Sequence, residues 1–486
     1  QIDDMLILGP DMRGLAIFLA VLIVAPTLVT AEPNWPGEPV DNHLYMSWAA
    51  LTQEVNDWSN ENPDIVMLSS IGQSFLGKEL WMVVLSDWSM ETKSDGSAKE
   101  IIYIDGGHHG NEYLGTALAW LTAKWYINEW NAQNEEAINV LQSTELHIMI
   151  MLNPDGNDAD TRHNLNVTTA ANPFVSEPVP TGIDLNRNYD HFWDDCSPSD
   201  PFAPGGSAFS EPETRANANY MNSVVQDADL YVTMHTGVWI MLYPWGKWPQ
   251  QPPDWELFHG IREEVNDGIS DIPIQNANQG LYPNCGTSRD YGYGVMGFPT
   301  FTFETDDEQF APGTFEDVND RLDEELDVMR YLIDNIWYWR ARLVVESFSI
   351  DDEVVTFTVN NMGRASTQNA TLQYVNGDKV LWESDNFTAN ATSTKTITSS
   401  GFDHEDGEWR LSYQKRVVHS SQWVNESVDI NPSTSSFLTQ SVETLVWILQ
   451  AGAVPLFVVA FAFWWSREEK PFDLDEEEPL EAELIE

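Results

Sequence analysis

The segment from Gly106 to Glu112 contains two side chains that could hold a divalent metal ion. His109 and Glu112 stand three residues apart, between a predicted strand and a predicted helix. At such a junction both can point at one ion, and zinc accepts imidazole nitrogen and carboxylate oxygen at about 2.0–2.2 Å. The pair also recurs by chance, so a hydrogen-bonded loop histidine stays open as the alternative.

A third candidate ligand is His235. It ends the predicted strand over residues 230–234 and is followed by Thr236 and Gly237. A catalytic zinc site needs three protein ligands and one open position for water. His109, Glu112 and His235 meet that requirement, so the sequence predicts a site for one Zn²⁺ ion.

Further motifs accompany these ligands in a fixed order between residues 45 and 338. In chain order the motifs are Gly72-Gln73-Ser74 with Gly77-Lys78-Glu79-Leu80, His109-Gly110-Asn111-Glu112, Asn153-Pro154-Asp155-Gly156, Asp184-Leu185-Asn186-Arg187-Asn188, Ser210-Glu211-Pro212-Glu213-Thr214, His235-Thr236 and Phe301-Thr302-Phe303-Glu304. In this ordered set the chain resembles the zinc metallocarboxypeptidase family, typified by carboxypeptidases A and B. The resemblance implies a hydrolase that removes C-terminal residues from peptides by means of metal-activated water.

Two residues match catalytic groups of that family. Glu304 matches the glutamate that takes a proton from the water and passes it to the leaving amine. It also ends the apolar strand predicted over residues 298–303, where partial desolvation would raise its pKa and suit a general base. Arg162 resembles the arginine that stabilises the oxyanion. The alternative for Glu304 is an exposed acid at a strand end.

Three further residues resemble the family's substrate-binding groups. Asn186 and Arg187 match the pair that grips the terminal carboxylate, which a planar guanidinium can bind in bidentate fashion. Tyr282, eight residues before Asp290, matches the mobile tyrosine that closes over the substrate. The alternatives are a structural surface arginine and a packed loop aromatic.

The same register places Arg289 where the family selects the final side chain of the substrate. An arginine there favours C-terminal Glu or Asp by charge pairing. An ion pair between Arg289 and Asp290, or exposure of Arg289 to solvent, is the alternative interpretation. Asn111 departs from the digestive enzymes, which have an arginine before the zinc-binding glutamate.

The pattern of elements around these residues predicts an α/β domain over residues 40–340. Helical and strand-like segments alternate, as expected for a mixed, largely parallel sheet flanked by helices. Groups at the carboxyl ends of such strands are the first candidates for a site. The predicted helices cover 44–60, 113–130, 211–225 and 316–340, and the predicted strands cover 80–85, 101–104, 146–152, 230–235 and 298–303.

The rest of the chain predicts a β-sandwich and a membrane anchor. Short alternating runs over residues 343–430 indicate an all-β sandwich. Residues 12–31 read as a signal peptide. The apolar run over 445–465 is long enough for one transmembrane helix, followed by Arg467 and Lys470 and an acidic cytoplasmic tail over 466–486. We therefore expect a single-pass protein of the cell membrane with its catalytic domain outside.

Charge and cysteine content limit the partners further. The formal net charge of −54 repels nucleic acid, so peptide or protein C-termini remain the expected partners. An extracellular location would allow Cys196 and Cys285 to pair, although two unrelated thiols stay open.

Two other functions remain open on the sequence. Related folds keep the metal site and cleave amides of acylated amino acids or cell-wall peptides. A catalytically inactive binding protein is the third hypothesis. The presence of Glu304, Arg187 and all three candidate ligands argues against the inactive protein, and the sequence does not indicate the oligomeric state.

Overall fold

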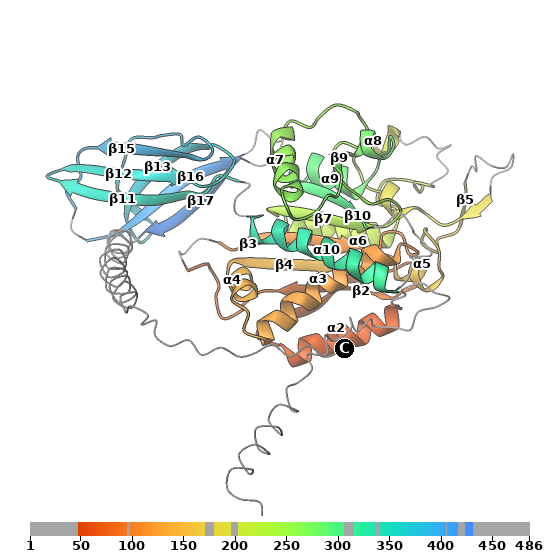
Figure 1. Cartoon of the computed structure of the whole chain (residues 1–486). Helices are drawn as coiled ribbons and strands as arrows, with labels where there is room; N and C mark the ends of the chain where they lie inside the picture. The colour runs from red at the N-terminus through yellow and green to blue at the C-terminus, as the bar shows by residue number, and fades with distance from the viewer. Residues whose placement is uncertain are drawn as a thin grey trace, which may run out of the picture. The chain divides into compact units, whose positions relative to one another are not determined.

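The structure is a computed structural model that describes residues 47–94, 98–170, 179–195, 203–305, 315–336, 340–404, 406–416 and 423–430. These residues form two compact units. One unit comprises the described residues between 47 and 336, and the other comprises those between 340 and 430 (Figure 1).

An eight-stranded sheet forms the centre of the first unit. Its order is β1-β2-β4-β3-β7-β10-β8-β9. The four neighbours β4, β3, β7 and β10 are parallel to one another, and β8 is parallel to β9, whereas the pairs β1–β2, β2–β4 and β10–β8 are antiparallel. The sheet is therefore mixed and mostly parallel, as predicted. The strands are β1 (Val66–Gln73), β2 (Glu79–Leu85), β3 (Glu100–Gly106), β4 (Thr144–Met149), β7 (Leu230–His235), β8 (Ile240–Tyr243), β9 (Ile274–Asn276) and β10 (Thr300–Glu304).

Helices cover both faces of this sheet. On β2, Val83 and Leu85 belong to a large core cluster that includes residues of α3 and α10, whereas Met82 and Val84 belong to a second cluster with residues of α6. Successive side chains of a strand point to opposite faces, so this alternation buries both faces of the sheet. The helices of eight or more residues are α2 (Trp48–Glu61), α3 (Tyr113–Asn131), α4 (Glu135–Ser143), α6 (Pro212–Ser223), α7 (Trp255–Asn266) and α10 (Phe315–Asp334).

Some elements differ from their predicted bounds. The strand predicted over residues 146–152 runs from Thr144 to Met149. The helix predicted over 316–340 ends earlier, at Asp334, where the Asn335 side-chain amide donates to the Tyr331 carbonyl at 2.9 Å. Such local bonding competes with the continuation of a helix. The strand predicted over 298–303 begins later and includes Glu304, which pairs with His235 of β7.

The second unit contains two antiparallel sheets that share one hydrophobic core. Burial alternates along β12, where Val355, Phe357 and Val359 point into the core. Leu372 and Leu411 contribute to the same cluster from the other sheet. The sheets are β11 (Leu343–Asp351), β12 (Val354–Asn361) and β15 (Ser393–Ser399), and β14 (Lys379–Glu383), β13 (Thr367–Asn376), β16 (Glu408–Arg416) and β17 (Trp423–Ile430).

The predicted membrane-related segments are not covered by this structure. Residues 12–31, 445–465 and 466–486 lie outside the described residues. Within the described part of the chain, every helix is too short or too polar to span a bilayer.

Candidate active site

Three adjacent parallel strands bring the predicted ligands and Glu304 together. His109 and Glu112 lie in the turn between β3 and α3, His235 is the last residue of β7, and Glu304 is the last residue of β10. Glu304 and His235 are direct register partners. Because β3, β7 and β10 are neighbours in the sheet and all point the same way, their carboxyl ends meet at one edge.

A glycine in the first turn of α3 permits the helix to approach the end of β7. A Cβ atom on Gly115 would lie 2.8 Å from the His235 amide nitrogen. The Gly115 amide also donates to Thr236 Oγ1 at 2.9 Å, and the Thr236 amide donates to Glu112 Oε2 at 3.2 Å. This close contact places Glu112 beside His235, although the two residues are far apart in the sequence.

His109, Glu112 and His235 form a buried cluster of metal-binding atoms. His109 Nδ1 lies 2.7 Å from Glu112 Oε1, and His235 Nδ1 lies 2.9 Å from Glu112 Oε2. The two Nδ1 atoms approach each other to 3.1 Å, and one ligand atom from each residue fits within 4.8 Å of the others. Two imidazole nitrogens that face each other beside a carboxylate can share one cation. Nitrogen and oxygen ligands in this number suit zinc.

Contacts behind the ligands fix their orientation. His109 Nε2 donates to Asp184 Oδ1 at 3.0 Å, which leaves the Nδ1 lone pair directed toward Glu112 and His235. His108, next to His109 in the sequence, faces another direction. Its Nε2 lies 2.8 Å from the Tyr189 hydroxyl, and its ring stacks on His235 with centroids 5.4 Å apart.

Asp184 is a site residue that the sequence reasoning did not single out. It is fully buried and accepts hydrogen bonds from His109 and from Arg162 Nε, the latter at 3.0 Å. Although burial opposes its ionisation, Arg162 and His109 hold the pKa of Asp184 well below its usual range. In the sequence, the role of Asp184 was indicated only by its place in the motif, two residues before Asn186.

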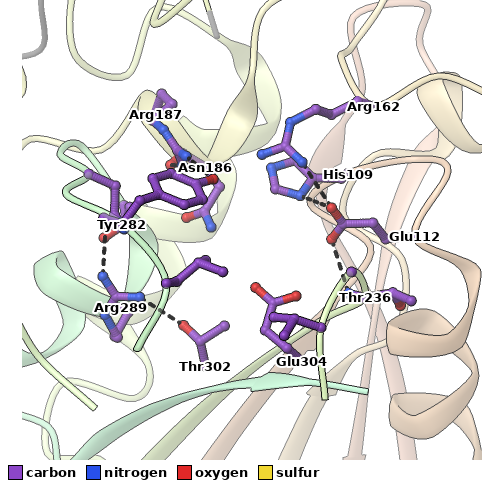
Figure 2. A pocket seen from close by; sticks show the side chains of 15 residues that line it. His109, Glu112, Arg162, Asn186, Arg187, Thr236, Tyr282, Arg289, Thr302 and Glu304 are labelled. Carbon is purple, nitrogen blue, oxygen red and sulfur yellow. Dashed lines mark hydrogen bonds and ion pairs between the residues drawn. The ribbon is translucent and has the colours of Figure 1, made fainter. Parts of the chain in front are cut away.

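Arg162 and Glu304 both line the cavity, and Figure 2 shows His109 and Glu112 between them. Arg162 Nη1 donates to Glu112 Oε1 at 2.9 Å. Although burial opposes the charge, Asp184 and Glu112 raise the pKa of Arg162, so it stays cationic. Glu304 is partly exposed to the cavity and is not a fully exposed strand-end acid. Burial raises the pKa of Glu304 to about 7, and Glu112 adds to this rise, while His235 and Arg162 oppose it.

The predicted carboxylate-binding residues lie together across the cavity. Arg187 ends the short helical turn η1 (Leu185–Arg187) and is only 3% exposed, so it is not a surface arginine. Its Nη2 donates to the Tyr282 hydroxyl at 3.0 Å, and its Nη1 donates to the Asn186 carbonyl at 2.8 Å. The Asn186 side chain is held in turn by the Ser288 amide, which donates to Oδ1 at 2.9 Å.

Arg289, on α9 (Ser288–Gly294), lines the same cavity and is buried. Its Nε donates to Asp290 Oδ1 at 3.0 Å, so the ion pair named as the alternative is present, whereas exposure to solvent is not observed. Its terminal nitrogens bond to uncharged oxygens, Nη1 to Thr302 Oγ1 at 3.3 Å and Nη2 to Asn284 Oδ1 at 2.9 Å.

One cavity therefore unites the predicted site. His235 lies buried directly behind Glu112. The sequence reasoning assigned no role to Thr236, Asn284, Thr287 or Thr302, which also line the cavity. The predicted residues that line it are His109, Glu112, Arg162, Asn186, Arg187, Tyr282, Arg289 and Glu304.

The model of the family described as zinc carboxypeptidase, Peptidase M14, matches residues 51–320, more than half of the chain. The chain belongs to the zinc carboxypeptidase family. In this family setting His109, Glu112 and His235 are the ligands of one Zn²⁺ ion. The match lies within the first unit and leaves the second outside.

Relatives of known name agree with this family. Carboxypeptidase B of Astacus astacus is 24% identical over 267 residues, which cover 52% of this chain and 84% of that protein. Carboxypeptidase B of Bos taurus is 25% identical over 286 residues, which cover 54% of this chain and 63% of that protein. The solved structure of thrombin activatable fibrinolysis inhibitor is similar in fold, with a TM-score of 0.51 and 21% identity over 60% of this chain and 74% of that one.

The loop that carries Tyr282 also carries a cysteine. Cys285 is disulfide-bonded. Cys196, the other cysteine of the sequence, lies outside the described residues.

Asp184→Asn should weaken zinc binding because the variant loses the anionic acceptor that orients His109. We expect a loss of roughly 10- to 100-fold in zinc affinity, as for other partners behind metal ligands. The measurement is competition with a fluorescent chelator on the full chain. Asp229→Asn is the matched control, since Asp229 is also buried but accepts from the Ile101 amide at the opposite end of β3. Equal affinities of the two variants would contradict the assigned role of Asp184.

Proposed function

We propose that this zinc carboxypeptidase removes single residues from free C-termini of peptides and proteins. The observation that carries the proposal is the position of the buried Arg187, which lies across one cavity from the zinc ligands, with Glu304 beside them (Figure 2). A guanidinium in that position can hold a terminal carboxylate while the last peptide bond reaches the metal side.

The catalytic roles follow from the groups that face the cavity. Zinc, when bound, polarises the scissile carbonyl and lowers the pKa of water. In this proposal Glu304 accepts a proton from the attacking water and returns it to the departing amine nitrogen. A carboxyl whose pKa lies near 7 can do both at neutral pH. Arg162, which stays cationic, is the nearest guanidinium to the ligand side and can donate to the developing oxyanion.

Tyr282 and Arg187 together prepare the carboxylate site. The Tyr282 hydroxyl accepts from Arg187 Nη2, so it occupies a hydrogen-bonding position that a terminal carboxylate would take. Substrate binding then exchanges a neutral acceptor for a charged one, which forms a stronger hydrogen bond with the guanidinium. The exchange frees Tyr282 to move over the substrate.

Glu304→Gln and a blocked substrate together test this function. We expect Glu304→Gln to lower kcat by about 10²- to 10⁴-fold, because the amide cannot accept the proton, while zinc content stays unchanged. Wild-type protein should cleave a peptide with a free C-terminus and should leave its C-terminally amidated form intact. Hydrolysis of the amidated peptide at a comparable rate would favour the related amidohydrolase activity instead.

For the substrate's last residue we propose a preference for Glu or Asp. The support is Arg289, whose terminal nitrogens face the cavity and bond only uncharged oxygens of Thr302 and Asn284 among the contacts described above. A side-chain carboxylate would be a better acceptor than either oxygen. Asp290 balances part of the charge but contacts Nε, on the inner side of the guanidinium.

Arg289→Leu should reverse the order of two otherwise identical peptides that end in Glu and Leu. Removal of one partner of a buried charge pair costs about 2 kcal/mol or more, which is roughly 30-fold in kcat/KM for the Glu peptide. The Leu peptide should be cleaved as fast or faster, since the pocket loses a charge. Wild-type protein that prefers Leu over Glu would refute the acidic preference but leave the peptidase function standing.

We also propose that the enzyme is held at the cell surface by one helix. The support is the apolar run over residues 445–465, the basic Arg467 and Lys470 after it, and the signal-like segment over 12–31. In chain order the predicted β-sandwich lies between the catalytic unit and the proposed membrane helix. Alkaline carbonate should leave the full chain in the membrane pellet and release a variant that lacks residues 445–486. Release of the full chain would contradict the anchor.

A further inference from the structure

The side chain of Asn284 bridges the Arg289 guanidinium and the loop that carries Tyr282. Its Oδ1 accepts from Arg289 Nη2 at 2.9 Å, and its Nδ2 donates to the Tyr282 carbonyl at 2.8 Å. Its own amide donates to the Gly246 carbonyl at 3.0 Å. Asn284 is 8% exposed and lines the cavity, so both ends of its carboxamide are used within the site.

Gly246 encloses this bridge on one side. A Cβ atom at that position would lie 1.9 Å from Asn284 Oδ1 and 2.1 Å from Arg289 Nη2. The Gly246 amide also donates to both carboxylate oxygens of Asp290, at 3.1 and 2.9 Å. The contact between Asn284 and Arg289 therefore fills a space that only glycine leaves open, and it is not an incidental contact between two mobile side chains.

Tyr282 is consequently tied to both substrate-facing arginines. Its hydroxyl accepts directly from Arg187, and its carbonyl is linked to Arg289 through the amide of Asn284. Figure 2 shows Arg187, Tyr282 and Arg289 along the same side of the cavity. A terminal carboxylate competes for the first link, the hydrogen bond from Arg187 to the Tyr282 hydroxyl. A side-chain carboxylate competes for the Arg289 end of the second link, because it would take the Arg289 donor that Asn284 Oδ1 now accepts and would leave the Asn284 side chain held to the Tyr282 carbonyl alone.

We propose that Asn284 is a specificity-determining positioning residue that couples recognition of an acidic C-terminal side chain to the movement of Tyr282. This inference rests on the proposed function. A substrate ending in Glu weakens both the Arg187–Tyr282 hydrogen bond and the link from Arg289 through Asn284 to Tyr282. A substrate ending in Leu weakens only the Arg187–Tyr282 hydrogen bond. The preference for acidic residues then appears in kcat as well as in KM, since the closure of Tyr282 over the substrate differs between Glu- and Leu-ending peptides.

The test compares Glu- and Leu-ending peptides on the full zinc-loaded chain. Asn284→Ala should reduce the Glu-to-Leu ratio of kcat/KM by about fivefold or more, with part of the loss in kcat. Asn284→Asp keeps an acceptor for Arg289, adds a charge that competes with the substrate, and loses the donor to Tyr282. It should reduce the ratio further. Asn266→Ala is the control, since Asn266 caps the Ser270 and Ile272 carbonyls outside the cavity.

Double variants distinguish coupling of Asn284 to Arg289 and Tyr282 from a general role of Asn284 in holding the Tyr282 loop in place. In an Arg289→Leu background, Asn284→Ala should leave the Glu-to-Leu ratio unchanged. In a Tyr282→Phe background, its effect on kcat should shrink, because the hydroxyl tie is already absent. Equal losses for both peptides, or full additivity in both backgrounds, would overturn the coupling. Zinc content and circular dichroism verify folding, and Asn284→Asp supplies the answer if Asn284→Ala loses zinc.

The outcomes also distinguish this inference from the function on which it rests. If the wild-type protein prefers the Glu peptide and the Asn284→Ala variant keeps that preference, the inference alone is overturned. Wild-type protein without a preference for Glu overturns both the inference and the proposed specificity.

Discussion

The parallel pairing of β3, β7 and β10 is the constraint on which the site depends. It brings the turn after β3, the last residue of β7 and the last residue of β10 to one edge of the sheet. The sheet positions His235 and Glu304 as register partners, and α3 adds Glu112 through its close contact at Gly115. Because these strands are buried on both faces, the sheet packing fixes where the ligand residues stand.

The second organising feature is the alternation of acids and arginines around the cavity. Asp184 accepts from His109 and Arg162, and Arg162 also donates to Glu112, so a continuous chain of charge-assisted hydrogen bonds joins the two ligands His109 and Glu112. On the opposite side, Arg187 bonds only neutral oxygens of Asn186 and Tyr282 among the hydrogen bonds described above. The first side orients the metal ligands, and in the proposed function the second side binds the carboxylate of the substrate.

The sequence predicted the parts of this design that depend on local pattern. The buried strands are recognisable as apolar runs, whereas the three zinc ligands and Glu304 became specific only through the ordered motifs that accompany them. The short strands β8 and β9 and the bonding roles of Asp184 and Asn284 were not predicted. Their positions come from tertiary contacts such as the packing of Gly246 against Asn284 and Arg289, and no spacing in the sequence reports these. The pairing of Arg289 with Asp290 was foreseen only as an alternative, because burial decides it.

The metal site joins distant parts of the chain. Glu112 and His235 are separated by 123 residues, yet each supplies a ligand to the same ion. An ion held at both positions acts as a crosslink that closes a long loop, and the entropy of the unfolded chain falls accordingly. Metal binding free energy is thereby also folding free energy. Zinc therefore stabilises the folded first unit as well as supplying its reactive centre, so loss of the metal would lower the free energy of unfolding of that unit.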